Sequence, residues 1–366
     1  MWARVDVQNL DADIDHLLTV VEHSAHDCRP HVVLIERADA ADILIVARLE
    51  DGPLETRIGY RTIARPRARV LRVSFGGVIG AETDADRRLA LDELRRTLRE
   101  DEADLVVLPQ LDTDGALWAL ASTTGSALMR DAAQARNAHW SVAIPESMDD
   151  FLAPRSKNTR KSTKYYDRRM LRDHPETRVR LFCEEADLDE LCDAMERVAA
   201  TTYQRSIGAG YADSPLERAL MRLVMRRSWF RTWVLYFGET PVAFWQGFAY
   251  RGVYATGCPG FDPAYTQDRV GAYLAVRMIE QLCESDDVHT LDWGHGDADY
   301  KRNFGDRCLE EGEVHFYAAT LRGARLRLVR GAAATAVRLA KRVLASSGRI
   351  KRVKRAWRDR LASDRG

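Results

Sequence analysis

Apolar positions switch between two periods along the chain, which predicts a fold of mixed helices and strands. Residues 41–49 and 67–75 are rich in β-branched and apolar side chains and predict strands. Residues 84–100 place leucines on one helical face among charged residues, which predicts an amphipathic helix. Residues 104–111 predict another strand and 115–123 a short helix. We therefore expect an α/β or α+β lobe in the first part of the chain.

One turn signal interrupts this first lobe. The dipeptide Asp51-Gly52 lies between the apolar run 41–49 and the segment 52–63. Because Asp-Gly between two such runs is typical of a tight hairpin turn, we expect the two segments to pair as a hairpin.

The clearest strand pattern lies in the second half of the chain. Residues 232–257 hold three apolar runs separated by "GETP" and "RG", which predicts a three-stranded meander. A loop at 258–268, a helix at 269–285 and a strand at 288–293 are expected to follow, and a helix is expected upstream from about Ser156. This order places the chemically dense residues in loops at the ends of strands, where functional groups often lie.

Length and charge distribution divide the chain further. A sequence of 366 residues with 46% hydrophobic content can bury two cores. We expect an N-terminal lobe at 1–150, a catalytic lobe at 151–321 and a basic tail at 322–366. The tail holds 15 Lys and Arg residues against two acidic residues, although the net charge of the whole chain is zero. The remaining body is thus acidic overall, which argues against a nucleic-acid partner for it.

The cysteines and the start of the sequence bear on the compartment. Six cysteines are scattered, with no C-x-x-C pair and no histidine at zinc-ligand spacing, so we expect buried reduced thiols and no metal site. The first residues lack a signal-peptide pattern, and no apolar run has the length of a membrane span. We expect a cytoplasmic protein.

The segment "GHGDADYKRNFGD" at 294–306 directly follows the strand expected at 288–293. His295 is a candidate general base, because the ordinary pKa of histidine lies near neutral pH, and Asp292 is a candidate base or orienting group. Tyr300 is a candidate proton donor, and Lys301 a candidate anion holder. The alternative interpretation is a solvated turn rich in glycine and aspartate.

The start of the helix at 269–285 is a candidate phosphate site. A helix N-terminus offers unpaired backbone N–H groups and a partial positive charge, and Gly271 permits close approach to the backbone. The alternative is an ordinary capped helix, with Thr266 or Asp268 as N-cap. The candidate cofactor-binding residues are Arg269, Val270, Gly271, Ala272 and Tyr273.

Two further segments carry dense charge. Ser156, Arg160 and Lys164 share one helical face and form either an anion-binding wall or a solvated surface. In the tail, the apolar stripe of Ile350, Val353, Trp357 and Leu361 lies opposite Lys and Arg residues. Such a helix can lie on an anionic membrane, dock on the acidic body or a partner helix, or contact nucleic acid.

Residues 253–306 resemble the GNAT-type acetyltransferase family of the cellulose-biosynthesis (CelD-like) type. That family shows a helix start "SPG-x-x-L" and an ending "D-x-G-x-G-D-x-x-YK-x-x-F". The resemblance covers roughly 151–316 and departs at Arg269-Val270, where the family has Ser-Pro. Matching positions are Gly271 and Leu274 for the helix start, Asp292, Gly294, Gly296, Asp297, Tyr300, Lys301 and Phe304 for the ending, and Ser156 and Arg160 for a basic S-x-x-x-R region.

The resemblance implies a tandem GNAT-like acyl-CoA N-acyltransferase fold, with mixed central sheets flanked by helices and similar to the FemAB-type peptidoglycan aminoacyltransferases. It implies acetyl-CoA or another acyl-CoA as donor, without a metal. The expected acceptor is an amino sugar or another cell-envelope or polysaccharide precursor at the cytoplasmic membrane face. Open alternatives are an aminoacyl-tRNA donor and an inactive binding scaffold. The candidate substrate-binding residues are Ser156, Arg160, Gln246, Tyr265 and Asp297, whereas Trp245 is expected in the core.

Overall fold

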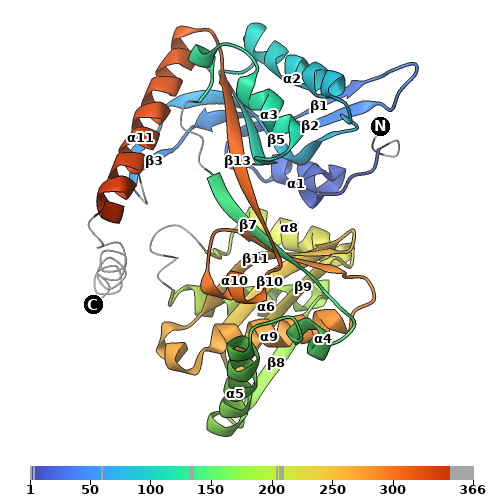
Figure 1. Cartoon of the computed structure of the whole chain (residues 1–366), viewed down its shortest axis with the longest axis vertical. Coiled ribbons are helices and arrows are strands. Elements are labelled where there is room, and N and C mark those ends of the chain that lie inside the picture. The colour runs from blue at the N-terminus through green and yellow to red at the C-terminus, as the bar shows by residue number, and fades with distance from the viewer. Residues whose placement is uncertain are drawn as a thin grey trace. The chain divides into compact units, whose positions relative to one another are not determined.

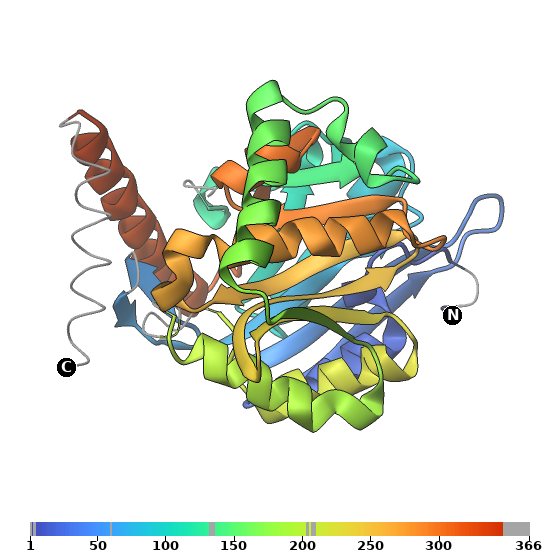
Figure 2. The same ribbon diagram turned by 90° about the horizontal axis from the view of Figure 1, so that it is seen from below.

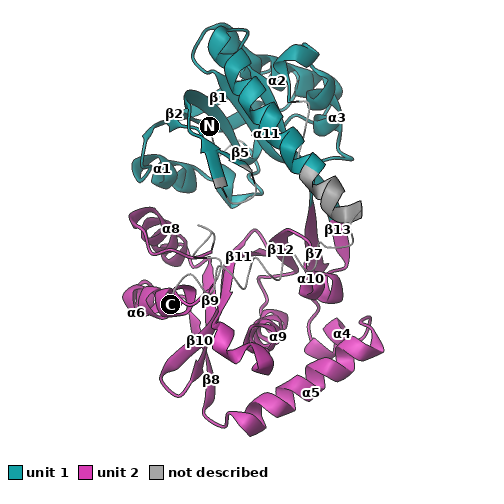
Figure 3. Cartoon of the chain, turned by 90° about the vertical axis from the view of Figure 1, so that its left-hand side faces the viewer, with its two compact units in different colours: residues 1–137, 309–363 teal, residues 138–308, 364–366 magenta. Residues whose placement is uncertain are grey.

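The computed structural model describes residues 2, 5–58, 61–131, 136–202, 205 and 210–346. The chain forms two compact units (Figures 1 and 3). Of the described residues, unit 1 contains those up to 137 and those from 309 to 346, and unit 2 contains those from 138 to 308. This division differs from the expected lobes, which change at 150/151 and 321/322. The difference arises because residues 138–143 pair with a strand of unit 2, whereas residues 311–317 pair with a strand of unit 1.

Unit 1 is built on a mixed sheet with strand order β1-β2-β5-β6-β13. The pair β5–β6 is parallel, and the other pairs are antiparallel. The strands are β1 (Asp27–Ile35), β2 (Ile43–Pro53), β5 (Arg67–Ile79), β6 (Leu105–Asp112) and β13 (Arg307–Tyr317). The helices are α1 (Ile14–Glu22), α2 (Asp84–Arg99), α3 (Ala116–Thr123) and α11 (Leu321–Ser346), with short 3-10 turns η2 (Leu10–Ala12) and η3 (Ala127–Met129).

Both faces of the unit 1 sheet are buried, because side chains alternate across it. In β2, Ile43 and Ile45 belong to the core beneath α2 and α3, whereas Leu44 and Val46 belong to the core with α1. All four side chains are inaccessible to solvent. The apolar run that predicted β2 is therefore continuous because both faces of this central strand are buried.

The hairpin expected at Asp51-Gly52 is wrong. Strand β2 runs straight through this dipeptide to Pro53 and pairs with β1 on one side and β5 on the other. A Cβ at Gly52 would lie 2.9 Å from Cγ of His26, so the glycine permits close approach of a neighbouring ring rather than a turn. Strands β3 (Thr56–Ile58) and β4 (Arg61–Ala64) form a separate small sheet.

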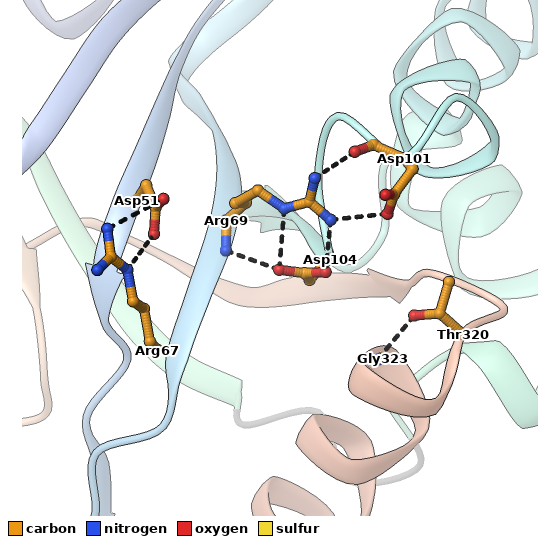
Figure 4. Close-up of polar contacts among 7 residues, drawn as sticks. All are labelled: Asp51, Arg67, Arg69, Asp101, Asp104, Thr320 and Gly323. Atoms are coloured by element: carbon orange, nitrogen blue, oxygen red, sulfur yellow. Dashed lines mark hydrogen bonds and ion pairs between the residues drawn. The ribbon is translucent and has the colours of Figure 1, made fainter.

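Arginines on β5 hold this region of unit 1 together (Figure 4). Arg67 pairs with Asp51 across the β2–β5 ladder, with Nε 2.9 Å from Oδ1. Arg69 pairs with both Asp101 and Asp104 in the connection between α2 and β6. Because the Asp104 side chain is only 3% exposed, the arginine and a backbone N–H are what make its burial tolerable.

Helix α11 follows β13, and its first turn is capped by the Thr320 hydroxyl, which accepts a hydrogen bond from the Gly323 N–H at 3.1 Å (Figure 4). Within the described part of the chain, no helix has both the length and the apolar character that crossing a bilayer requires. The amphipathic stripe expected at 350–361 lies outside the described residues.

The strands of unit 2 also include parallel and antiparallel pairs and follow the order β7-β12-β11-β10-β9-β8. The meander expected at 232–257 is confirmed as β9, β10 and β11, and the helix expected from 269 is confirmed as α9. The strands are β7 (Arg136–Ala143), β8 (Thr177–Phe182), β9 (Phe230–Phe237), β10 (Thr240–Tyr250), β11 (Val253–Phe261) and β12 (Thr290–His295). The helices are α4 (Met148–Leu152), α5 (Lys157–Asp173), α6 (Leu188–Ala199), α8 (Pro215–Arg226), α9 (Val270–Cys283) and α10 (Asp299–Phe304), with 3-10 turns η4 (Glu185–Asp187) and η5 (Pro263–Asp268).

Helices α5 and α9 lie on one side of the unit 2 strands, and α6 and α8 lie on the other (Figure 2). Strand β10 contacts both α9 and α6. Its alternation sends Trp245 toward α9, where the indole Nε1 donates to the Gly271 carbonyl at 3.0 Å. The next residue, Gln246, donates to Glu217 of α8 at 2.8 Å. Trp245 is 4% exposed, so its expected place in the core is confirmed.

The parallel pair β11–β12 separates partway along its length. The two strands pair at three positions, where 253–255 lie opposite 290–292. Beyond them β11 continues along β10 to Phe261, and β12 continues along β7 to His295. The residues from Trp293 to His295 thus lie where the two parallel strands part.

Candidate active site

The start of α9 has an unusual backbone conformation. Arg269 occupies the N-cap position in the left-handed region, with φ 56° and ψ 39°, and provides no side-chain cap. The expected caps are therefore wrong: the Thr266 hydroxyl bonds within the preceding turn, and Asp268 faces Arg169 and His174 at 3.6 Å each. The N-cap side chain thus accepts no hydrogen bond from the first backbone N–H groups of α9. These N–H groups give the start of the helix a partial positive charge.

A pocket of about 250 Å³ lies between α5, α9 and α10. The Arg269 guanidinium at its wall lies over the Tyr166 ring, 4.3 Å from the centroid. The two acidic residues that line the pocket both form ion pairs, Asp167 with Arg277 and Asp299 with Arg302. The lining residues are Thr159, Ser162, Thr163, Tyr166, Asp167, Arg269, Ala272, Tyr273, Val276, Asp299, Tyr300, Asn303 and Phe304.

Tyr300 connects this pocket to the separating strands. Its ring makes edge contacts with Trp245 and Trp293, with centroids 5.5 Å away in both cases. Burial raises the pKa of its phenol to about 12, so the hydroxyl keeps its proton at neutral pH. A buried, protonated phenol at the pocket wall fits the expected role of proton donor.

Lys301 has a different arrangement from the one expected. Its side chain is buried, and its Nζ donates to the backbone carbonyls of Gly294 at 3.0 Å and of His295 at 2.6 Å. Burial lowers the pKa of this ammonium. The partner of Asp297 is Arg302, at 2.7 Å between Nε and Oδ1. Lys301 therefore fixes the backbone at the end of β12 through these two hydrogen bonds, an arrangement that we call the Lys301 clamp.

A histidine that the sequence did not single out completes the cluster. The β7–β12 pairing sets His139 beside Asp292, with Nε2 2.6 Å from Oδ1, and both side chains are partly buried. The Gly294 N–H donates to the same carboxylate oxygen at 2.7 Å. The His139 and His295 rings lie 4.8 Å apart. A carboxylate oxygen beside Nε2 accepts from a ring N–H, so this contact favours the tautomer of His139 that carries its proton on Nε2.

The remaining predicted residues are distributed over unit 2. Ser156 caps α5 by accepting from the Thr159 N–H at 3.1 Å, and Arg160 donates to the Ala153 carbonyl at 2.7 Å. Tyr265 packs edge-on against Phe237. Gln246 lies on the opposite face of the sheet from Trp245, as its bond to α8 shows. None of Ser156, Arg160, Gln246 and Tyr265 lines the pocket.

Of the expected cofactor-binding residues, Arg269, Ala272 and Tyr273 line the pocket. Val270 is fully buried, and Gly271 accepts the Trp245 bond through its carbonyl. The hydroxyl groups of α5 were missed. Thr159, Ser162, Thr163 and Tyr166 recur at a spacing of three to four residues, a helical stripe that the sequence did display.

Comparisons with known proteins agree with this fold. Residues 157–302 match the family described as Acetyltransferase (GNAT) domain, a span that runs from the first residue of α5 into α10. FemX is similar in structure with a TM-score of 0.63 and 10% identity, over 89% of this chain and 96% of that one. No curated protein matches the sequence.

Two other solved structures are similar, both with a TM-score of 0.52. A conserved protein of unknown function from Bacteroides thetaiotaomicron shares 12% identity, over 85% of this chain and 93% of that one. The C-terminal domain (DUF2156) of a putative lysylphosphatidylglycerol synthetase from Agrobacterium fabrum shares 11%, over 89% and 91%. At such identities the likeness shows the fold alone. Together with the match over 157–302, it confirms the expected mixed α/β fold, in which residues 157–302 are similar to the GNAT acetyltransferase domain.

Proposed function

We propose that this protein transfers an acyl group, acetyl in the simplest case, from acyl-CoA to a primary amine. The observation that carries this proposal is the meeting of three features at one pocket: the start of α9, the Arg269 guanidinium and the protonated Tyr300 phenol. The matched family supports an acetyl donor. The donor's pyrophosphate is suited to a helix N-terminus with a neighbouring arginine, since both offer hydrogen-bond donors and positive charge.

The residues around the separating strands supply the proton transfers that the reaction needs. The acceptor nitrogen attacks the thioester carbonyl, its C–N bond forms, and the C–S bond to CoA breaks. His139, held in one tautomer by Asp292, takes the ammonium proton, and Tyr300 gives a proton to the departing thiolate. Lys301 positions these groups by fixing the carbonyls at the end of β12. His295 lies against His139 and is the second candidate base.

The acceptor we propose is an amino sugar or another cell-envelope or polysaccharide precursor, as in the CelD-like type that the motif at 292–304 resembles. The protein would act in the cytoplasm, at the inner face of the membrane. The structural likeness to a domain of a putative lysylphosphatidylglycerol synthetase supports an envelope-related acceptor.

A second candidate is a FemAB-like transferase that uses aminoacyl-tRNA. The likeness to FemX, which extends over 89% of this chain, is the observation in its favour. The two donors are distinguished by which ligand stabilises the folded protein. CoA should protect the protein against thermal unfolding under the first proposal, and charged tRNA should do so under the second.

The test of the proposed function is release of free thiol from acetyl-CoA in the presence of primary amines, with amino sugars and their nucleotide-linked forms as the first panel. Mass spectrometry of the amine then identifies the acetylated product. Thiol release that requires the amine supports the proposal. Binding of acyl-CoA without release for any amine would favour an inactive scaffold, which is the alternative raised by Arg269-Val270 in place of the family's Ser-Pro.

A further inference from the structure

Helix α5 presents two chemically different faces. One face lines the pocket with Thr159, Ser162, Thr163 and Tyr166. At 3.6 residues per turn, eight exposed side chains on the other side fall within an arc of about 140°, while the exposed Asn158 and Asp173 lie outside it. The eight comprise six cations, which we call the cationic face, and two large apolar side chains. The cationic face consists of Lys157, Arg160, Lys161, Lys164, Arg168 and Arg172, and the apolar residues are Tyr165 and Leu171.

The charge of the cationic face is largely uncompensated. Lys157, Lys161, Lys164 and Arg168 form no ion pair with any residue that the structure describes, whereas Arg172 pairs with Asp173 at 2.8 Å. A hollow of about 450 Å³ over this surface is lined by Tyr165 and basic residues alone. The face extends over about 22 Å of helix, since each residue adds 1.5 Å. Such a density of unpaired positive charge fits a polyanionic partner.

Two apolar side chains lie among these cations. Tyr165 is 58% exposed and lies at one edge of the cationic face, and Leu171 is 52% exposed and lies between Arg160 and Lys164 around the helix. Exposed aromatic and aliphatic groups flanked by Lys and Arg are the composition of surfaces that insert shallowly into a lipid interface. A nucleic-acid surface would gain from a stacking tyrosine but not from an exposed leucine.

We propose that the cationic face of α5 docks on an anionic lipid bilayer. The basic tail of the chain is excluded as its occupant, because the segment from 322 to 366 carries 15 cations against two acidic residues and would be repelled. Docking through this face sets the opposite face of the same helix, and with it the pocket, close to lipid headgroups. The proposal does not depend on acyl-CoA as donor, because it concerns a surface and not a reaction.

The experiment is co-sedimentation of the full chain with phosphatidylglycerol/phosphatidylcholine vesicles, with pure phosphatidylcholine vesicles as reference. The triple variant K161Q, K164Q, R168Q should bind the anionic vesicles about 100-fold more weakly, since each cation near such a surface changes the partition about fivefold. Glutamine keeps the helix propensity, and the thermal midpoint verifies the fold. The matched control removes three charges from the C-terminal end of α8 and its C-cap residue in the same unit, as R222Q, R226Q, R227Q, and should bind like the wild type.

Two further measurements separate the surface from other causes of binding. The variant L171Q leaves the charge unchanged and should weaken vesicle binding, while leaving any binding to bulk tRNA as it was, because a nucleic acid gains nothing from the leucine. Equal binding by the α5 triple variant and the α8 control would overturn the proposal, and would assign vesicle binding to another part of the chain. Tight tRNA binding that the α5 triple variant alone loses, without vesicle binding by the wild type, would also overturn it.

Discussion

Replacing Lys301 with methionine tests the clamp at the end of β12. In the wild type, the buried Nζ donates to the carbonyls of Gly294 and His295. Methionine fills a similar volume without a donor, so both carbonyls lose their partner. Hydrogen bonds to a charged group contribute about 1.5–3 kcal/mol each, and part of this is offset by the cost of burying the ammonium. We therefore expect the free energy of unfolding of unit 2 to fall by about 2–4 kcal/mol.

The dependence of stability on pH distinguishes the loss of the ammonium group and its hydrogen bonds from a packing defect. Burial lowers the pKa of Lys301 below its ordinary value of 10.5, so the folded state binds fewer protons than the unfolded state in the interval below 10.5. The cost of the buried charge is fully present below the folded pKa and is lost as the pH rises toward 10.5. The stability advantage of the wild type over Lys301→Met should therefore grow with pH across that interval.

The assay is urea unfolding followed by tryptophan fluorescence, with hydrogen exchange of the peptide covering 290–306 as a local readout. Lys161→Met on the exposed side of α5 is the matched control and should change the stability by less than about 0.5 kcal/mol. A loss in Lys301→Met no larger than in this control, with unchanged exchange at 290–306, would refute the clamp.

Four other outcomes are expected. Arg269→Gly keeps the left-handed backbone, because glycine adopts positive φ without strain, and should leave stability intact while weakening CoA binding about tenfold, as measured by calorimetry. His139→Gln and Asp292→Asn should each lower turnover about 100-fold, and turnover equal to that of the wild type in both variants would exclude the pair as base. The wild type should lose stability as the pH rises from 10 to about 12, because the raised pKa of the Tyr300 phenol means that its protonated form stabilises the folded state. Tyr300→Phe should not show this loss, and equal curves of stability against pH for both proteins would contradict the prediction. Deletion of the residues after Ala345 should reduce vesicle binding by the α5 triple variant further if the tail also contacts lipid, and identical sedimentation would remove the tail from that role.

Much of the fold could be predicted where the local pattern and the tertiary environment agree. The meander at 232–257 combines apolar runs with strong turn residues, and α9 has a sustained helical period of apolar residues, although its capping residue was not predicted. Asp51-Gly52 shows the opposite case. Its turn propensity is local, whereas pairing with two neighbouring strands across the whole of β2 involves many more hydrogen bonds and buried side chains. The long-range ladder determined the structure there.

Strands β7 and β13 escaped prediction for a related reason. Their sequences, "RNAHWSVA" and "RCLEEGEVHFY", mix charged and apolar residues without a sustained period. Each forms because partners distant in sequence accept its hydrogen bonds: β7 pairs with β12, and β13 pairs with β6. Such strands are recognisable only once the rest of the sheet exists.

The candidate site likewise contains residues that the local sequence could reveal and residues that only the folded sheet brings together. Residues 292–301 are contiguous, so their concentration of polar groups was visible in the sequence. His139 lies 153 positions before Asp292 and joins it only through strand register. The direction of the Lys301 side chain depends on how α10 packs, and the sides taken by Trp245 and Gln246 depend on which face of β10 meets α9. Residue types indicated the chemistry, but their orientation required the assembled sheet.

The most direct test of the acyl-CoA proposal is a thermal-shift titration with acetyl-CoA, longer acyl-CoAs and free CoA, carried out on the wild type and on Arg269→Gly. A ligand at 100 times its dissociation constant adds about 2.7 kcal/mol to the stability of the folded protein. We expect a saturable rise of the midpoint for the wild type and a shift of the titration to higher concentrations for Arg269→Gly. No rise with any of these ligands, while charged tRNA raises the midpoint, would contradict the acyl-CoA donor and support the second candidate function.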